Sequence, residues 1–134
     1  MGLRLSNRKV RQYMALAQSI ADIFPTCKRG SVACVLLSKE GVTFGYNGGA
    51  AGDPVSCVGG DPGLCGCVHA EANAVAKSTL TGDKLAFVTT APCKVCAALF
   101  VNAGITSVYY SESYRNDSGL LLLNRCNVKT KEVK

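Results

Sequence analysis

The second half of the sequence alternates short apolar runs with segments of helical periodicity, and this alternation restricts the fold more than any other feature. Three runs have the length and residue types of strands: 84–90, 105–110 and the residues around Val128. Three helices are expected beside them: His69 to about Leu80, Cys93–Ala103 and Leu120–Asn124. Strands that are separated by helices tend to pair in parallel, because the connection must cross the sheet. This half of the chain is therefore predicted to be a largely parallel α/β structure.

The first half is predicted to add one helix and a hairpin. Ser6 precedes a segment in which apolar residues recur every three or four positions, and Pro25 ends it. The apolar run 32–37 and the strand-like stretch 42–46 flank a Lys-Glu-Gly turn, which predicts a β-hairpin whose first strand is buried on both faces. Together, the two halves predict a three-layer α/β/α fold with a mixed central sheet of about five strands.

Length and composition are those of one folded unit. The chain has 134 residues, and we expect residues 1–134 to form a single domain. Its 48% hydrophobic and 18% charged residues exclude a disordered chain. No apolar run approaches the roughly 20 residues of a membrane-spanning helix, and the first segment lacks the pattern of an export signal, so a cytoplasmic protein is expected. The formal net charge of +6 favours an anionic partner.

Two motifs, each at the start of a predicted helix, carry ligands for one metal ion. They read HAE at 69–71 and PCKVC at 92–96. Cys93 and Cys96 share one face of a helical turn at the positive end of the helix dipole, which favours thiolates. These two thiolates and the His69 imidazole are a typical donor set for zinc, and three protein ligands leave the fourth position to water. The open position predicts a catalytic zinc site.

Glu71 stands two residues after His69, where its carboxyl can move protons without occupying the metal. His69 is the only histidine in the chain. The joint pattern H-x-E and P-C-x-x-C is a known signature of zinc nucleobase deaminases. Two other interpretations stay open. One is a closed zinc site, with Cys67 as fourth ligand and Glu71 at the surface, and the other is a non-catalytic binding module that zinc stabilises.

With these motifs, the sequence resembles deoxycytidylate (dCMP) deaminases of the small bacterial and phage type, within the cytidine deaminase superfamily. The similar segments also include TCKR at 26–29, GYNG at 45–48, VHAEANA at 68–74 and SESYR at 111–115. The resemblance implies a cytidine-deaminase-like fold and hydrolysis of dCMP to dUMP and ammonia, which supplies dUMP for thymidylate synthesis. It also implies that Glu71 transfers protons from water to N3 of the base and to the leaving amine.

The resemblance also assigns the substrate contacts. Asn47 would hydrogen-bond the sugar, the backbone of Ala70 would contact the base, and Tyr114 would pack beside the base. Arg29 and Arg115 are the candidate phosphate ligands, because a guanidinium can hold two phosphate oxygens at once. Whether dCTP is also a substrate stays open.

Many members of this family are hexamers that dCTP activates and dTTP inhibits, which implies a homohexamer with an effector site here. The resemblance places this site partly at Gly48 and Gly49. They lie in a glycine-rich stretch, 47–66, that lacks periodicity and is predicted to be a long functional loop. Ala50 stands where the family usually has proline, so the loop lacks the fixed backbone angle of that residue.

Cys57, Cys65 and Cys67 lie in or beside the same loop, and some phage relatives carry a second, structural zinc. A second zinc in this chain would need a further ligand, such as Cys27 or Cys34. We favour buried thiols over a second zinc, because free cysteine often behaves as a small core residue.

Other deaminases remain as alternatives: enzymes that act on tRNA adenosine, on cytidine in single-stranded DNA, or on free cytidine. Proteins that bind single-stranded nucleic acid need a basic channel with aromatic platforms for the bases. This chain has no tryptophan and only 7% aromatic residues, and no basic stripe stands out. A mononucleotide is therefore the expected substrate.

Overall fold

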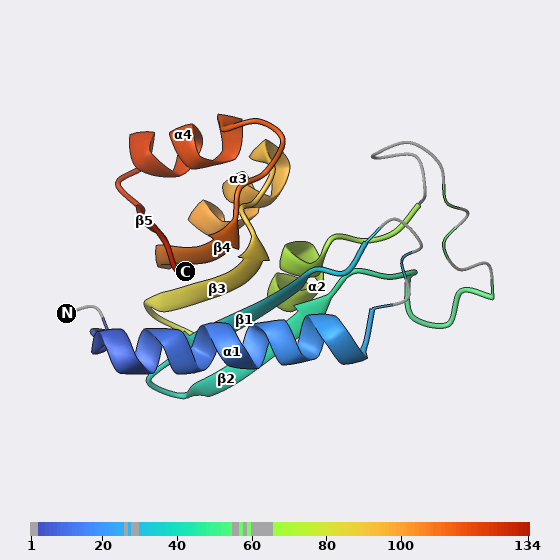
Figure 1. Cartoon of the computed structure of the whole chain (residues 1–134), viewed down its shortest axis with the longest axis horizontal. Helices are drawn as coiled ribbons and strands as arrows, with labels where there is room; N and C mark the ends of the chain where they lie inside the picture. Colours follow the sequence, from blue (N-terminus) through green and yellow to red (C-terminus); the bar gives the residue numbers. More distant parts are fainter. Residues whose placement is uncertain (1–2, 26, 28–29, 55–56, 58, 60–65) are drawn as a thin grey trace.

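The computed structural model describes residues 3–25, 27, 30–54, 57, 59 and 66–134. Figure 1 shows the elements along the chain. They are α1 (Asn7–Ile23), β1 (Ala33–Ser38), β2 (Gly41–Tyr46), α2 (Ala70–Lys77), β3 (Lys84–Thr90), α3 (Lys94–Asn102), β4 (Ile105–Glu112), α4 (Ser118–Arg125) and β5 (Lys129–Glu132). Among the described residues, no helix combines the length and the apolar character that a bilayer crossing requires.

The strands form one mixed sheet in the order β2-β1-β3-β4-β5. β1 pairs antiparallel with both β2 and β3, whereas β3, β4 and β5 run parallel. In the centre of the sheet, Val88 pairs with Cys34 on one side and with Tyr110 on the other. The predicted hairpin, the mixed five-stranded sheet and the parallel second half are therefore confirmed.

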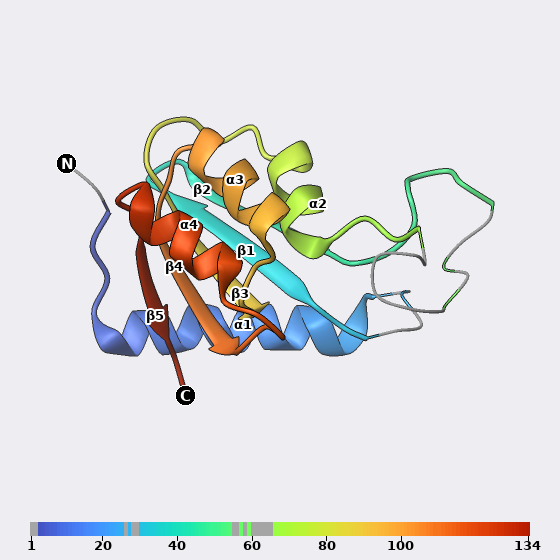
Figure 2. The ribbon, with the colours of Figure 1, turned by 90° about the horizontal axis from the view of Figure 1, so that it is seen from above.

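Helices cover both faces of this sheet (Figure 2). α1 packs on one face, against Val35 and Leu37 of β1 and Phe87 of β3. The opposite face carries α2, α3 and α4, whose buried residues form one core cluster with Cys34 and Leu36 of β1. Every residue of β1 is buried, because both of its faces are covered. The structure thus confirms the three-layer α/β/α fold.

The bounds of α2 and α4 differ from the sequence prediction. α2 ends at Lys77 rather than near Leu80, because Ser78 adopts an extended conformation and its hydroxyl accepts a hydrogen bond from the Leu80 N–H at 3.1 Å. α4 is longer than expected and covers 118–125. Asn127 then adopts a left-handed backbone conformation, with φ of 63°, which asparagine tolerates better than most residues and which redirects the chain into β5.

Candidate metal centre and active site

Three potential metal ligands meet where α2 and α3 begin. His69 is the N-cap of α2, Cys93 is the N-cap of α3, and Cys96 lies in the first turn of α3. The His69 Nδ1 atom lies 3.7 Å from the Cys93 Sγ and 3.4 Å from the Cys96 Sγ. A tetrahedral zinc ion, with bonds of about 2.3 Å to sulfur and about 2.0–2.1 Å to nitrogen, separates such ligand atoms by roughly 3.6 Å. The donor types and their spacing therefore fit zinc.

The two thiols of this site differ in protonation. Hydrogen bonds from the Cys96 thiol and from His69 lower the pKa of the Cys93 thiol to about 3. The hydrogen bond between the two cysteines, together with burial, raises the pKa of Cys96. Cys93 is therefore a thiolate at neutral pH, and the thiolate is the form that binds zinc.

Glu71 lies in the first turn of α2, and its side chain is buried. Burial raises the pKa of this carboxyl to about 7, although a hydrogen bond from its own backbone N–H and the nearby His69 act in the opposite direction. Burial and the Glu71 charge also raise the pKa of the core thiol Cys34. A carboxyl that titrates near neutral pH can both accept and release protons, so Glu71 has the properties of a general acid and base.

A cavity beside these groups brings together segments that are distant in the sequence. His69, Glu71 and Cys93 line it. Four of the predicted substrate residues line it as well: Asn47, Ala70, Tyr114 and Arg115. Arg29, the other predicted phosphate ligand, lies outside the described residues. The fold thus gathers the described substrate candidates around the potential metal site.

The predicted effector residues Gly48 and Gly49 lie elsewhere, since neither is among the residues that line this cavity. The backbone of Gly48 pairs with Val68: its N–H donates to the Val68 carbonyl at 3.2 Å, and its carbonyl accepts from the Val68 N–H at 2.7 Å. This bridge attaches the loop directly before His69. An effector site at these glycines stays a prediction.

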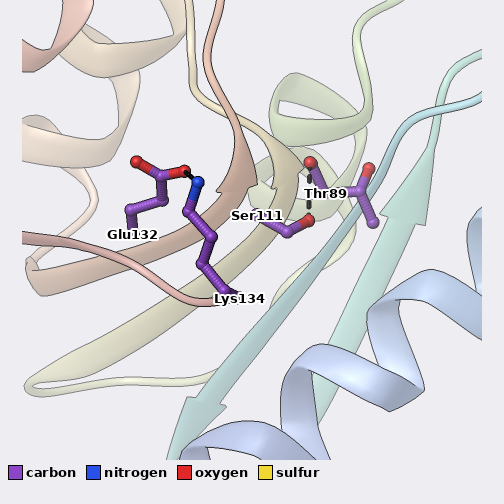
Figure 3. Close-up of polar contacts among 4 residues, drawn as sticks. All are labelled: Thr89, Ser111, Glu132 and Lys134. Atoms are coloured by element: carbon purple, nitrogen blue, oxygen red, sulfur yellow. Dashed lines mark hydrogen bonds and ion pairs between the residues drawn. The ribbon is translucent and has the colours of Figure 1, made fainter.

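Hydrogen bonds tie together the ends of β1, β3 and β4 beside the cavity, and Figure 3 shows the one between Ser111 and Thr89. The Ala33 N–H of β1 donates to the Thr89 Oγ1 of β3 at 3.1 Å, and the Ser111 Oγ of β4 donates to the Thr89 carbonyl at 2.9 Å. Directly after the end of β3, the Ala91 N–H donates to the Glu112 carbonyl of β4 at 2.8 Å. The segment that leads from β3 into α3 is therefore anchored to β4 before it reaches the potential metal ligands Cys93 and Cys96.

Asn47 has a structural role that the sequence did not indicate. Its side-chain Oδ1 accepts a hydrogen bond from the Val32 N–H, and its Nδ2 donates to the Gly30 carbonyl, both at 2.8 Å. The side chain therefore holds the segment that precedes β1, and this segment also lines the cavity. The contact with the sugar stays a prediction. These two hydrogen bonds do not use the whole amide, which has a second N–H and a second lone pair for such a contact.

A second group of potential ligands consists of Cys27, Cys57 and Cys67. Their sulfur atoms all lie within 4.8 Å of one another, and the Sγ atoms of Cys27 and Cys57 are 3.8 Å apart. Two thiolates on one tetrahedral zinc ion are separated by a similar distance, roughly 3.8 Å. Cys67 thus groups with these residues rather than with His69, and Cys65 lies outside the described residues.

The fold and the donor set together define a cytidine-deaminase-like zinc-binding domain. Residues 7–112 match the family model described as the cytidine and deoxycytidylate deaminase zinc-binding region, and the chain belongs to this family.

The chain is similar to curated proteins and to a solved structure. The chain is 32% identical over 113 residues to ComE operon protein 2 of Bacillus subtilis (strain 168), across 78% of this chain and 60% of that protein. It is 31% identical over 119 residues to the deoxycytidylate deaminase of Saccharomyces cerevisiae, across 78% of this chain and 38% of the relative. The chain therefore spans less than two thirds of the length of these relatives. The crystal structure of dCMP deaminase from the cyanophage S-TIM5, in complex with dCMP and dUMP, is similar with a TM-score of 0.86 and 26% identity, across 97% of this chain and 100% of that one.

Proposed function

We propose that this chain is a zinc-dependent deaminase that hydrolyses dCMP to dUMP and ammonia. One observation carries the proposal: the buried Glu71 carboxyl shares a cavity with the donor residues His69 and Cys93. Three protein ligands that leave one zinc position to water, with a carboxyl beside them, form the arrangement that hydrolytic deamination requires. The similarity to the S-TIM5 dCMP deaminase, whose crystal contains dCMP and dUMP, supports this nucleotide as the substrate.

Each residue of the site has a separate task in this reaction. Zinc held by His69, Cys93 and Cys96 would supply an activated water molecule at neutral pH. Glu71 accepts a proton from the attacking water and delivers it to N3 of cytosine, which makes C4 more electrophilic. The oxygen of this water adds to C4, and Glu71 takes the remaining proton of the new C4 hydroxyl group and passes it to the amino group, so that the C4–N bond breaks and ammonia leaves. The pKa of this carboxyl, raised to about 7 by burial, suits a group that must be charged at one step and protonated at the next.

The nucleotide is held by the residues that line the rest of the cavity. The Arg115 guanidinium lies over the Tyr114 ring, 5.0 Å from its centroid, and we assign this arginine to the phosphate. Arg29 is the second phosphate ligand by resemblance. Tyr114 packs beside the base, the backbone of Ala70 contacts it, and Asn47 contacts the sugar. Arg29 and Arg115 both carry a permanent positive charge, which is complementary to the negative phosphate of dCMP.

Regulation and assembly belong to the same proposal. We assign dCTP activation and dTTP inhibition to a site near Gly48 and Gly49, within a homohexamer that acts in the cytoplasm. The Gly48–Val68 bridge supports such coupling, because it joins this loop to the residue that precedes His69. The reducing cytoplasm also keeps cysteine thiols in the form that can bind zinc. Rate curves that stay flat as dCTP and dTTP are added, or a monomer in sedimentation, would contradict these assignments.

The number of zinc ions is a further part of the proposal. We infer one catalytic zinc at His69 and one structural zinc at Cys27, Cys57 and Cys67, which needs a fourth ligand beyond these three to close its tetrahedral shell. The sulfur spacing of the cluster supports the second ion, whereas the sequence alone favoured buried thiols. Metal analysis of the purified chain should find two zinc ions, and Cys57→Ser should lose one of them while deamination persists. A single zinc ion in the wild type would instead favour buried, metal-free thiols at Cys27, Cys57 and Cys67.

An ammonia-release assay across a panel of substrates tests the proposed reaction. The panel contains dCMP, deoxycytidine, cytidine, dCTP, a short cytosine-containing DNA strand and a tRNA. We expect the highest kcat/KM with dCMP. A preference for the DNA strand or the tRNA would favour a nucleic-acid deaminase, and a preference for cytidine would favour a nucleoside deaminase. Bound zinc without activity on any substrate would favour a binding module that zinc stabilises.

A further inference from the structure

Gly119, the second residue of α4, lies against the backbone of the segment that carries the ligand Cys93. Gly119 is buried, and a Cβ atom built on it would overlap the Pro92 carbonyl oxygen and lie 3.0 Å from the carbonyl carbon and oxygen of Cys93. Side chains essentially never approach a backbone this closely. Gly119 is not among the glycines with positive φ, so its missing side chain serves the contact rather than a special backbone angle.

Both sides of this contact are held in place. On one side, the Cys93 carbonyl accepts the first hydrogen bond of α3, from the Ala97 N–H at 2.9 Å. On the other side, Leu123 fixes α4 in the core, where its side chain is fully buried. Since neither backbone is free to retreat, a methyl group at position 119 must displace Cys93, the first turn of α4, or both.

The first turn of α4 is also attached to the residues that we assign to the nucleotide. Residues 113–117 connect β4 to α4 and carry Tyr114 and Arg115, which line the cavity. The Ser118 N–H and Oγ donate hydrogen bonds to the Asn116 Oδ1 at 3.1 and 2.6 Å, so this connection is fastened to the start of the helix. A shift of the helix start would therefore be transmitted to the connection.

We propose that Gly119 is a positioning residue of the active site: close backbone contact at this glycine sets the location of Cys93 relative to Tyr114 and Arg115. This inference rests on the zinc site of the proposed function. It adds a residue that belongs neither to the donor set nor to the residues that line the cavity. Its substitution should disturb metal binding and nucleotide binding together, although Gly119 itself supplies no group to either site.

The test compares Gly119→Ala with Leu123→Val in the full chain. The control shortens a buried side chain of the same helix and weakens the core, but unlike Gly119→Ala it adds no atom beside the backbone of 92–93. Zinc affinity is measured by competition with a chromophoric chelator, and Co²⁺ in place of zinc reports the ligand geometry through its absorption bands. Zinc binding and cobalt bands that are present in the wild type and absent from His69→Ala are assigned to the His69 site. The same proteins are unfolded in urea to measure their stability.

We expect Gly119→Ala to weaken zinc binding by at least about tenfold, the low end of the effect for residues that support metal ligands. The same substitution should shift the cobalt bands and raise KM for dCMP. Leu123→Val should unfold at lower urea concentration with unchanged zinc affinity and cobalt bands. A folded Gly119→Ala with wild-type affinity and bands overturns the proposal. Failure of Gly119→Ala to fold where Leu123→Val folds also overturns it, since Gly119 would then serve the fold as a whole. Absence of zinc from the His69 site of the wild type would instead overturn the proposed function, and this inference with it.

Discussion

Glu71→Gln separates catalysis from metal binding more cleanly than any other substitution at this site. Glu71 is not part of the donor set, and glutamine has almost the same size, so zinc should stay bound. Glutamine cannot exchange protons as a carboxyl does, and general acid–base catalysis contributes about 100- to 10,000-fold. Because the Glu71 side chain is only 5% exposed, bulk water cannot replace it, and because one carboxyl serves both transfers, we expect the upper half of this range. A loss of about 1000- to 10,000-fold in kcat corresponds to roughly 4–5.5 kcal/mol of activation free energy.

The assay for this variant measures ammonia release at saturating dCMP together with zinc content and nucleotide affinity. Glu132→Gln is the matched control, because its carboxyl belongs to β5 and does not line the cavity. The control should keep the wild-type kcat. A Glu71→Gln protein that retains zinc and turns over within tenfold of the wild type would refute Glu71 as the proton carrier. Loss of zinc in this variant would instead assign Glu71 to the metal.

Three further predictions concern stability and substrate binding. In the metal-free protein, burial raises the pKa of Glu71 to about 7 from its ordinary value of 4.5. The stabilising effect of the protonated carboxyl is therefore complete below pH 4.5 and lost as the pH rises through 7. Urea unfolding should show that the free energy of unfolding falls by up to about 3 kcal/mol over this range, and Glu71→Gln should not show this fall. Arg115→Ala should raise KM for dCMP by about tenfold or more and leave KM for deoxycytidine unchanged, whereas Arg125→Ala, outside the cavity lining, should change neither. Asn47→Ala leaves two backbone groups without partners and should lower the free energy of unfolding by about 2 kcal/mol, and an unchanged urea midpoint would contradict its role in holding the segment before β1.

Local patterns in the sequence predicted most of the fold and pointed to His69, Cys93 and Cys96, which the structure brings together as a potential metal site. The spacing of Cys93 and Cys96 within one helical turn, and the position of His69 at another helix start, are properties of short segments, so the motif is visible without the tertiary structure. The apolar runs of strand length predicted the sheet for the same reason. The early end of α2 was missed because the Ser78 side chain competes with the helix for a backbone N–H, and periodicity does not report such competition.

Features that depend on contacts between distant segments could not be predicted. Cys27 and Cys57 are thirty residues apart in the chain, and only the path of the loop decides which cysteines meet. Asn47 was predicted to contact a sugar, but its hydrogen bonds with the segment before β1 appear only when that segment is in place. Gly119 reads as an ordinary glycine near a helix start until the neighbouring backbone of 92–93 is known. The roles proposed for the substrate residues, and the single domain of 1–134, stay predictions.

The most direct measurement is the rate of dUMP formation from dCMP by one preparation in three states: as purified, after complete removal of zinc, and after zinc is returned in stoichiometric amount. We predict that the rate falls to background when the metal is removed and recovers when zinc is restored, in proportion to the zinc bound at the His69 site. Turnover of dCMP that persists in protein shown to contain no metal would contradict a zinc-dependent deaminase.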